Sequence, residues 1–462
     1  MPFLFFWEKM GNMKKIIILC GLLLLTFFWG ILELKYGSHT ENRKMLITVL
    51  QQENMDQTGT GIQEDTETHK ENVVQTALGS EREIRVLLKS DGYASEYHSD
   101  ICITSDGDYE IRNGENNSLC RAGEEIRITS QSDLFAKEDV LQVSSDGGMF
   151  YFPELERAEE DIGYEGSLEI RKTDQGLLLV NVLSLEDYLC GVLPSEMSAS
   201  FPTEALKAQA ICARTYAIQQ QENGRAKEYG ADLDDSTSYQ VYNNRCHGEE
   251  TDQAVKETAG LVMIQDGVLA DARYYSTSCG LDLHMDLSED SVFAAFLQED
   301  KKRSVEAEEP MYRWKTSIRL SDLQAKTEWK RIESLEITER DDRGAAVCLE
   351  VAGQKSTGGK SVCEKIEGEY QIRQFLALAD PVITLQDEST REGWQLLPSA
   401  FILLNPVTEE ESLTGYEILG GGYGHGEGLS QNGAKHMAEQ GENCEEILKN
   451  YYGAIEIVRY SS

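Results

Sequence analysis

The sequence predicts an α+β fold that is rich in antiparallel sheet, has a helical region at its centre and is preceded by an N-terminal transmembrane helix. Short apolar runs that alternate with polar residues and end at Gly, Asp or Asn recur between residues 81 and 182, as is typical of antiparallel strands. A long pattern of helical spacing begins after Pro202. The uncharged apolar run 16–32 is close to the shortest length that crosses a bilayer.

The N-terminal apolar run is expected to be an uncleaved membrane anchor. Lys14 and Lys15 precede it and no small-residue cleavage site follows, although a removed signal peptide is the alternative. We therefore expect residues 1–36 to cross the cell membrane once, with the rest of the chain outside the cytoplasm. Residues 37–80 are polar and lack a helical or strand period, so they are expected to form a flexible tether.

The composition restricts the partners. The 462-residue chain has 81 acidic and 43 basic side chains, which gives a formal net charge of −38. Such a surface repels the phosphates of nucleic acids and anionic lipids, so we expect no nucleic-acid partner and a neutral or weakly charged ligand. The ten cysteines form no C-x-x-C pair and no His/Cys cluster at zinc-ligand spacing. We therefore predict no metal and no cofactor.

The first ordered regions are a β-rich part and a helix-bearing part. Within 81–182 a hairpin is expected, with its turn at Asp174-Gln175-Gly176. Within 183–282 a helix opens at Pro202-Thr203-Glu204. Four small or apolar residues recur on one face of that helix, which favours close packing against its neighbours: Leu206, Ala210, Ala213 and Ala217. A further strand pair is expected to turn at Asp266-Gly267.

The remaining regions continue the same mixture. Residues 283–400 form a second β-rich part, with a turn at "DDRG" and a helix near "EYQIRQFLAL". Residues 401–462 contain a strand, a glycine loop and two helices. The first helix stops at Gly441, and the second opens with a capping box of Asn443 and Glu446 and ends at Gly453.

Glu196 is the first candidate for chemistry. Its sequence neighbours Val192, Leu193 and Met197 are apolar, and such surroundings disfavour the charged form of a carboxyl and raise its pKa. A raised pKa is what a general acid at a glycosidic oxygen needs near neutral pH. The alternative, and the commoner case, is a glutamate that precedes a helix and is stabilised by the N-terminal dipole.

The segment "GGGYGHGEG" from Gly420 to Gly428 is the second candidate. Its glycines do not follow a nucleotide-binding pattern, but they permit close approach of the backbone to a ligand. Tyr423 offers an aromatic face for a sugar ring, and His425 offers hydrogen bonds to hydroxyl groups. A tight turn between strand and helix with a structural histidine is the alternative.

The segment "ARYYSTSCG" is the third candidate. Alternation places Tyr274, Ser276 and Ser278 on one face. Cys279 suggests a cysteine nucleophile with His284 or His425, but no basic surroundings are visible that would lower its pKa. A serine hydrolase is also disfavoured, because the chain has no G-x-S-x-G motif.

Several long segments, in order, resemble the SpoIID/LytB family: "LSLEDYLCGVLPSEM", "EALKAQAICARTYA", "YYSTSCG", "EYQIRQFLAL" and "GGGYGHGEGLSQNGAKHMAEQG" with the following "EEILKNYYGAIEI". The resemblance runs from about residue 82 to the end. It implies a peptidoglycan lytic transglycosylase whose catalytic acid and base is the glutamate of "PSEM", here Glu196. The helical region within 183–282 would then be the catalytic part.

The resemblance also implies binding residues and partners. Motif membership implies substrate-binding roles for Arg214, Tyr216, Ser276, Ser278, Tyr423, His425, Ser430 and Gln431. Arg214 could equally be a structural ion-pair partner, and Ser430 with Gln431 could simply open a helix. The implied partners are peptidoglycan glycan strands, a cell-wall amidase and membrane partners in engulfment during sporulation. Some clostridial members bind zinc before a "CQ-x-Y"-like segment, but here Tyr239 replaces the cysteine, so no metal is carried over.

A single carboxyl suffices for the implied reaction, because the C6 hydroxyl of the substrate itself attacks C1 and forms a 1,6-anhydro-muramyl end. A hydrolysing glycosidase generally uses two carboxylates, and Asp187 and Glu427 would be the candidates for a second. Two alternatives belong to other classes: a glycan-binding module that enhances a partner amidase, and an anchored scaffold in an engulfment complex.

Overall fold

The computed structural model describes residues 82–157, 162–242, 248–280, 286–298 and 304–460. The expected anchor and tether at 1–36 and 37–80 lie outside these residues, as do Cys246 and His284. Within the described ranges, no helix has both the length and the hydropathy needed to cross a membrane. All of these described residues except 264–268 belong to one compact unit.

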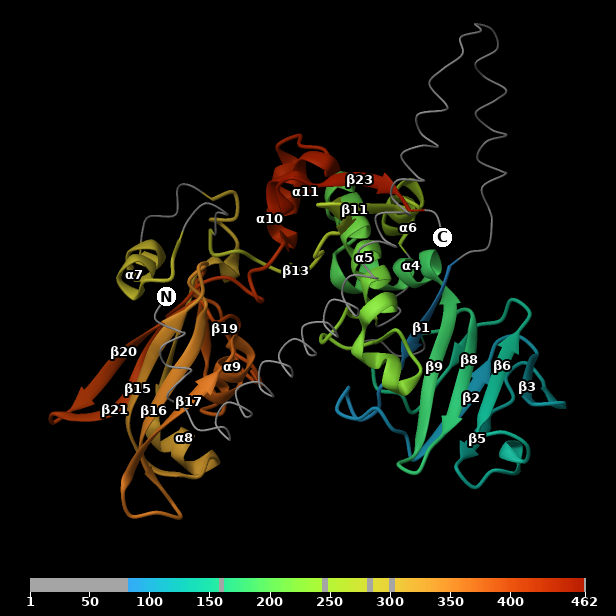
Figure 1. Cartoon of the computed structure of the whole chain (residues 1–462), viewed down its shortest axis with the longest axis horizontal. Helices are drawn as coiled ribbons and strands as arrows, with labels where there is room; N and C mark the ends of the chain where they lie inside the picture. Colours follow the sequence, from blue (N-terminus) through green and yellow to red (C-terminus); the bar gives the residue numbers. More distant parts are fainter. Residues whose placement is uncertain (1–81, 158–161, 243–247, 281–285, 299–303, 461–462) are drawn as a thin grey trace, which may run out of the picture. The chain divides into compact units, whose positions relative to one another are not determined.

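The described part of the chain begins with a seven-stranded sheet, drawn in blue and green in Figure 1. Its strands, in spatial order, are β10 (Leu233–Asp234), β1 (Glu83–Leu87), β9 (Leu177–Ser184), β8 (Ser167–Lys172), β6 (Val140–Ser145), β3 (Tyr109–Asn113) and β4 (Asn116–Cys120). Neighbours are antiparallel except β1 and β10. A smaller antiparallel sheet has the order β5 (Ile126–Thr129), β2 (Asp100–Ser105) and β7 (Phe150–Tyr151). The predicted β-rich character of this region is confirmed.

The expected hairpin is formed by β8 and β9. The Thr173 N–H donates to the Gly176 carbonyl at 2.9 Å, which closes the turn at the predicted place. Gly176 has a φ of 143°, and a Cβ there would lie 2.7 Å from the His98 carbonyl oxygen, so glycine is required. Strand β9 is buried along almost its whole length, and its buried residues are all apolar except Asn181. It leads directly into the helical layer.

Helices form the centre of the unit around α5 (Thr203–Asn223). The helices packed against it are α4 (Leu185–Glu196), α6 (Glu249–Glu257), α10 (Gln431–Glu439) and α11 (Cys444–Tyr452). All four residues predicted to form the buried face of α5 are inaccessible to solvent, and alanine is the commonest of its buried residue types. Small side chains let several helices approach α5 closely, as the sequence predicts. The stop at Gly441 and the capping box of Asn443 and Glu446 are also confirmed.

Two further antiparallel sheets and two helices make up the later part of the chain. The five-stranded sheet has the order β19 (Thr390–Arg391), β18 (Ile383–Leu385), β14 (Trp314–Arg319), β21 (Ser412–Gly420) and β20 (Ile402–Glu409). The three-stranded sheet has the order β15 (Trp329–Arg340), β16 (Ala346–Lys355) and β17 (Ser361–Glu367). They share one apolar core with α8 (Leu320–Lys326) and α9 (Glu369–Ala377). The predicted turn at "DDRG" joins β15 to β16, and α9 confirms the predicted helix.

Short elements complete the chain. They are the helix α7 (Asp290–Gln298) and the strands β11 (Leu261–Gln265), β12 (Val268–Leu269), β13 (Tyr274–Tyr275), β22 (Leu429–Ser430) and β23 (Glu456–Arg459). Asp266 and Gly267 both have positive φ, as the predicted tight turn between β11 and β12 requires. Strand β13 pairs in parallel with β22, which joins the "YYSTSCG" segment to the segment after the glycine loop.

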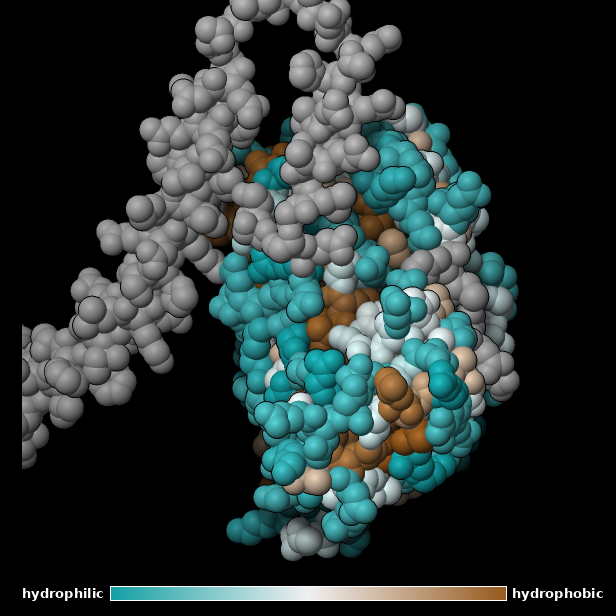
Figure 2. All heavy atoms as spheres, turned by 90° about the vertical axis from the view of Figure 1, so that its right-hand side faces the viewer, coloured by the Kyte–Doolittle hydropathy of each residue, from teal (hydrophilic) through white to brown (hydrophobic). Residues whose placement is uncertain are grey.

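The surface agrees with the acidic composition. Figure 2 shows a face on which hydrophilic residues predominate and hydrophobic residues form small patches between them. The fold class is thus a mixture of helices and antiparallel sheets, with helices gathered around the segment that contains Glu196.

Candidate active site

Helix α4 places Glu196 at its C-terminal end. Ser184 caps the start of the helix by accepting a hydrogen bond from the Asp187 N–H, and Glu196 is the last helical residue. The alternative interpretation of Glu196, as a glutamate that precedes a helix and is stabilised by the N-terminal dipole, is therefore wrong. The C-terminal end of a helix carries partial negative charge, which disfavours an ionised carboxyl. Gly191 and Pro194 lie inside α4 and conceal it in the sequence.

The Glu196 carboxyl is held by neutral donors from three separate segments. The Val241 N–H donates to Oε1 at 2.7 Å, and the Gln431 amide donates to Oε2 at 3.4 Å. A third hydrogen bond joins the carboxyl to the Tyr274 side chain. The residue as a whole keeps partial contact with solvent, while protein atoms surround its carboxyl densely.

Burial raises the pKa of Glu196 above that of an ordinary glutamate. Desolvation is the dominant cause, and the hydrogen bonds from Val241, Tyr274 and Gln431 offset part of it. Desolvation favours the protonated acid, while the three hydrogen bonds support the carboxylate that remains after proton transfer. A carboxyl in these surroundings can act first as an acid and then as a base.

A chain of hydrogen bonds fixes Tyr274 beside the carboxyl. The Gln240 amide donates to the Tyr274 hydroxyl at 3.2 Å and to the Ala213 carbonyl at 3.3 Å. The Tyr188 hydroxyl donates to Oε1 of Gln240 at 3.3 Å. Burial raises the pKa values of Tyr188 and Tyr274 well above the ordinary value, so both phenols stay neutral. Tyr216, predicted to bind substrate, lies near these two phenols and adds to the rise in both pKa values.

The paired strands β13 and β22 bring several predicted residues together. Ser430 caps α10 by accepting from the Gly433 N–H, and its neighbour Gln431 reaches Glu196. The Ser276 carbonyl accepts a 3.0 Å hydrogen bond from the Asn432 N–H, so Ser276 lies against the start of the same helix. Ser278 is buried, and its N–H lies 3.2 Å from the Ser430 hydroxyl oxygen. Ser430 therefore caps the start of α10, and the adjacent Gln431 contacts Glu196.

A second buried carboxyl, Glu306, supports this junction. The Ser278 N–H and the Ser430 hydroxyl both donate to its Oε1, at 2.9 and 2.5 Å. Burial raises the pKa of Glu306 to about 7, and the hydrogen bonds from Ser430 and Ser278 lower it in part. The sequence interpretation missed Glu306 because it is one of 81 acidic residues and has no motif around it.

His425 holds the glycine loop in place. Its Nε2 donates to the Tyr274 carbonyl at 2.9 Å, and its Nδ1 accepts from the Glu427 N–H at 3.1 Å. Burial, assisted by the nearby Arg273 charge, lowers the pKa of His425 to about 4, so the ring is neutral. Both ring nitrogens are engaged with the backbone, which agrees with the structural alternative rather than with direct contact to a sugar hydroxyl.

Tyr423 is the exposed aromatic residue of the loop. It pairs with Thr277 through two backbone hydrogen bonds, of 2.8 and 3.1 Å, and 38% of its surface is exposed. Its ring meets Trp394 edge to face, with 5.8 Å between the ring centroids. Trp394, which the sequence interpretation missed, thus enlarges the aromatic surface at the glycine loop.

Arg214 lies inside the helical layer and is inaccessible to solvent. Its guanidinium donates two hydrogen bonds to the Glu186 carboxylate, at 2.8 and 2.7 Å, and further ones to backbone carbonyls, including that of Leu261. This position does not allow contact with a substrate. The binding role implied by the motif is therefore replaced by the ion-pair alternative.

The other nucleophile and carboxylate candidates do not join the site. Cys279 is fully buried, and burial raises the pKa of its thiol to about 12, so a thiolate is strongly disfavoured. Glu427 forms ion pairs with Arg273 and Arg343. Asp187 is exposed at the opposite end of α4, about 13 Å from Glu196 along the helix axis. That separation exceeds the roughly 5–9.5 Å between the carboxyls of hydrolysing glycosidases.

Comparison with protein families identifies two consecutive matches. Residues 173–264 match the model of the stage II sporulation protein family, SpoIID. Residues 261–428 match a domain of unknown function, DUF8618. The first match contains Glu196 and α5, and the second contains the "YYSTSCG" segment and the glycine loop.

Similar proteins come from several bacteria. An uncharacterized protein of Brachyspira hyodysenteriae is 31% identical over 301 residues, which cover 65% of this chain and 73% of the relative. Stage II sporulation protein D of Bacillus subtilis is 27% identical, with coverages of 60% and 75%. The amidase enhancer of Bacillus subtilis is 29% identical, and the match spans 59% of this chain but 40% of that protein. The chain is a member of the SpoIID/LytB family.

Proposed function

We propose that this protein is a peptidoglycan lytic transglycosylase that cleaves the bond between N-acetylmuramic acid and N-acetylglucosamine, with Glu196 as both acid and base. One observation carries the proposal: the Glu196 carboxyl has a raised pKa and is held by three neutral donors, and among the described residues it has no cationic partner. A carboxyl of this kind holds its proton until a leaving group takes it.

The proposed reaction uses one carboxyl twice. Protonated Glu196 gives its proton to the glycosidic oxygen, and the bond between that oxygen and C1 breaks. The Glu196 carboxylate then accepts the proton of the C6 hydroxyl of the same muramyl residue, and that oxygen forms a bond to C1. The products are a 1,6-anhydro-muramyl end and a free hydroxyl on the departing sugar, and Glu196 is again protonated. No water molecule is consumed.

The donors around Glu196 act on the charged intermediate state. After the first proton transfer the carboxylate is stabilised by the Val241 N–H, the Gln431 amide and the Tyr274 hydroxyl. In the proposed mechanism the same carboxylate also offsets the positive charge that develops at C1. Asp187 accepts a hydrogen bond from Ser184 and Glu427 pairs with Arg343, so neither carboxylate takes part in these steps.

The family and the named relatives support a role in remodelling of the cell wall during sporulation. We propose that residues 1–36 anchor the protein in the cell membrane, and that the Glu196 site acts outside the cytoplasm. Membrane fractionation of the full chain, compared with a chain that starts at residue 37, tests the anchor. Equal recovery of both chains in the soluble fraction would exclude it.

The activity is tested with Glu196→Gln on purified glycan strands, with and without stem peptides. The amide has nearly the same shape but cannot donate an acidic proton, so release of anhydro-muramyl products should stop. Glu250→Gln, an exposed position on α6, is the matched control and should retain full activity. Circular dichroism of both variants checks that the fold persists. Undiminished product from Glu196→Gln would exclude the proposed mechanism.

A second function is favoured by one relative, which is named amidase enhancer. In this alternative the protein binds glycan and stimulates a partner amidase without catalysis of its own. Amidase activity would then rise equally with wild type and with Glu196→Gln. Loss of the stimulation in Glu196→Gln would instead tie the enhancement to glycan cleavage.

A further inference from the structure

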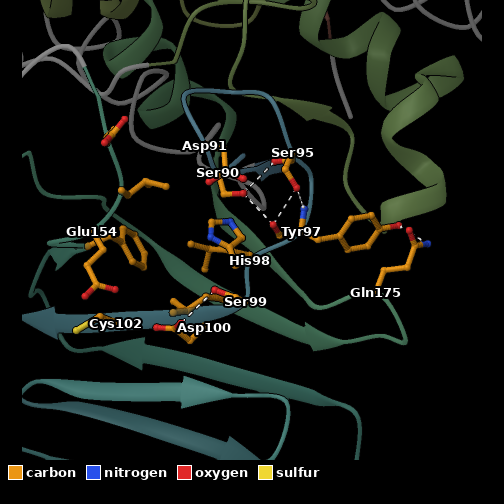
Figure 3. Close-up of a pocket in the computed structure, with 15 residues that line it drawn as sticks. Ser90, Asp91, Ser95, Tyr97, His98, Ser99, Asp100, Cys102, Glu154 and Gln175 are labelled. Carbon is orange, nitrogen blue, oxygen red and sulfur yellow. Dashed lines mark hydrogen bonds between the residues drawn. The ribbon is translucent and has the colours of Figure 1, made fainter.

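The N-terminal region contains a cavity of about 520 Å³ that shares no lining residue with the Glu196 site. Figure 3 shows this cavity beside the segment that leads into β2. The lining combines an imidazole, aromatic rings and carboxylates, and the residues that matter here are Asp91, Tyr97, His98, Asp100, Glu154 and Glu156.

His98 offers the cavity a hydrogen-bond acceptor. The side chain is 8% exposed, and its Nε2 lies 2.8 Å from the Leu88 carbonyl oxygen. A carbonyl only accepts, so Nε2 carries the proton and Nδ1 has a free lone pair. Burial is the main cause that lowers the pKa of His98, and Arg157 adds to it, so the ring stays neutral. Among the described residues Nδ1 has no hydrogen-bond partner, which leaves it for a donor in the cavity.

The charge of the lining is negative. Asp91, Asp100, Glu154 and Glu156 line the cavity, and the described lining includes neither lysine nor arginine. Arg127 forms ion pairs with both Asp100 and Glu154 and offsets one of these charges. Asp91 and Glu156 have no ion-pair partner among the residues that the structure describes. Carboxylates without a cationic partner favour a cationic ligand.

Aromatic side chains add a contact surface. The Tyr97 hydroxyl accepts a 3.1 Å hydrogen bond from the Gln175 amide, which fixes the ring at one side of the cavity. Phe152 also belongs to the lining and is held by Tyr164, with 5.3 Å between the ring centroids. Such rings attract an ammonium group and pack against the apolar face of a ring-shaped ligand.

We propose that this cavity binds a saccharide that carries a protonated amino group, such as the glucosamine unit of a glycan that lacks the N-acetyl group. The ammonium pairs with Asp91 and Glu156, and a hydroxyl donates to Nδ1 of His98. That this saccharide belongs to the cell wall rests on the proposed function. The chemistry by which the cavity would bind it does not depend on that function.

Calorimetry of the full chain with a glucosamine tetrasaccharide tests the proposal, with the fully N-acetylated tetrasaccharide as the neutral comparison. The test variant is Asp91→Asn with Glu156→Gln. Asp91 has a φ of 51°, a conformation that asparagine tolerates, so this double change removes charge without strain. The control is Glu115→Gln with Asp146→Asn, which removes the same charge from exposed positions outside the cavity.

We expect the test variant to bind the amino tetrasaccharide about threefold to tenfold more weakly, as two partly exposed ion pairs imply, and the control to bind like wild type. The imidazole nitrogen resonances of His98 should shift on addition of the amino sugar. An adventitious attraction to the acidic surface would weaken equally in both double variants and overturn the proposal. Equal binding of the N-acetylated tetrasaccharide, or no binding by wild type, would also overturn it.

The experiment separates this inference from the proposed function. Glu196→Gln should bind the amino tetrasaccharide at this cavity as wild type does, because the two sites share no residue. If the wild-type protein binds the amino tetrasaccharide but has no lytic activity, only the proposed function is overturned. Intact lytic activity with no amino-sugar binding would overturn only this inference.

Discussion

The Ser430 hydroxyl donates a 2.5 Å hydrogen bond to Oε1 of Glu306, a carboxyl that is 3% exposed. The next residue, Gln431, donates to Glu196. The first turn of α10 therefore joins two buried carboxyls of different character. Glu196 is held so that it can exchange a proton with substrate, whereas Glu306 is enclosed and joins backbone segments.

Glu306→Gln should change the pH dependence of stability. The pKa of Glu306 is about 7 in the folded protein against 4.5 ordinarily, so the folded state binds the proton more tightly. Protonation of Glu306 therefore stabilises the folded state by about 3 kcal/mol at most. This stabilisation is fully present below about pH 4.5 and is lost as the pH rises through 7. The amide mimics the protonated acid, so the variant should lose this dependence. Urea unfolding between pH 5 and 8 measures it.

The comparison variant is Glu306→Ala, which leaves the Ser278 N–H and the Ser430 hydroxyl without their acceptor. It should be less stable than Glu306→Gln by about 1–3 kcal/mol for each unsatisfied group. The other titratable groups near Glu306 among the described residues are unchanged in both variants: His436, Glu309, Tyr275, Cys279 and Tyr451. An identical pH slope in wild type and Glu306→Gln would contradict the assignment.

Tyr274→Phe should move the basic limb of the activity profile to higher pH. Activity needs protonated Glu196, so it falls as the pH rises through the pKa of that carboxyl. The hydrogen bond from Tyr274 lowers this pKa, so its removal should raise the pKa. Initial rates of anhydro-product release between pH 4 and 9 measure the limb. Tyr423→Phe, which removes a hydroxyl from the exposed loop tyrosine, should leave the limb in place.

Two substitutions at Gln431 should raise the pKa of Glu196 by different amounts. Gln431→Ala removes one donor to the carboxylate, which should reduce kcat/KM by about twofold to tenfold and raise the pKa of Glu196. Gln431→Glu adds a like charge beside Glu196, which raises that pKa further. The basic limb should therefore lie lowest in wild type, higher in the alanine variant and highest in the glutamate variant. Any other order would mean that Gln431 does not act on the Glu196 carboxyl.

Arg214→Leu should destabilise the protein without affecting recognition of substrate. The change leaves Glu186 without its ion-pair partner, and since that carboxylate is partly exposed we expect a loss of about 2–3 kcal/mol. Denaturant unfolding measures the loss, and KM of the folded fraction should stay unchanged. A raised KM at unchanged stability would restore the substrate-binding role of Arg214.

Local patterns predicted many elements of the fold. The hairpin turn before Gly176, the apolar face of α5 and the capping box at Asn443 are all set by neighbouring residues, so a sequence can show them. Helix α4 escaped prediction because Gly191 and Pro194 usually mark breaks, yet Pro194 falls in the last turn, where burial of Val192 and Leu193 outweighs the missing hydrogen bond.

The candidate site was only partly predictable. Glu196 and Gln431 stand in recognisable motifs, but their contact joins residues 235 positions apart. Val241 acts through its backbone N–H, for which no side-chain pattern exists. Tyr274 had a usable signal, since alternation places it on the same face as Ser276 and Ser278.

The central claim is that Glu196 drives an intramolecular cleavage of glycan, and product analysis in ¹⁸O-labelled water tests it most directly. Wild type should release 1,6-anhydro-muramyl ends that contain no ¹⁸O, because the attacking oxygen comes from the sugar itself. Glu196→Gln should release none. Reducing ends that carry ¹⁸O, or unlabelled anhydro ends in undiminished amount from Glu196→Gln, would contradict the account.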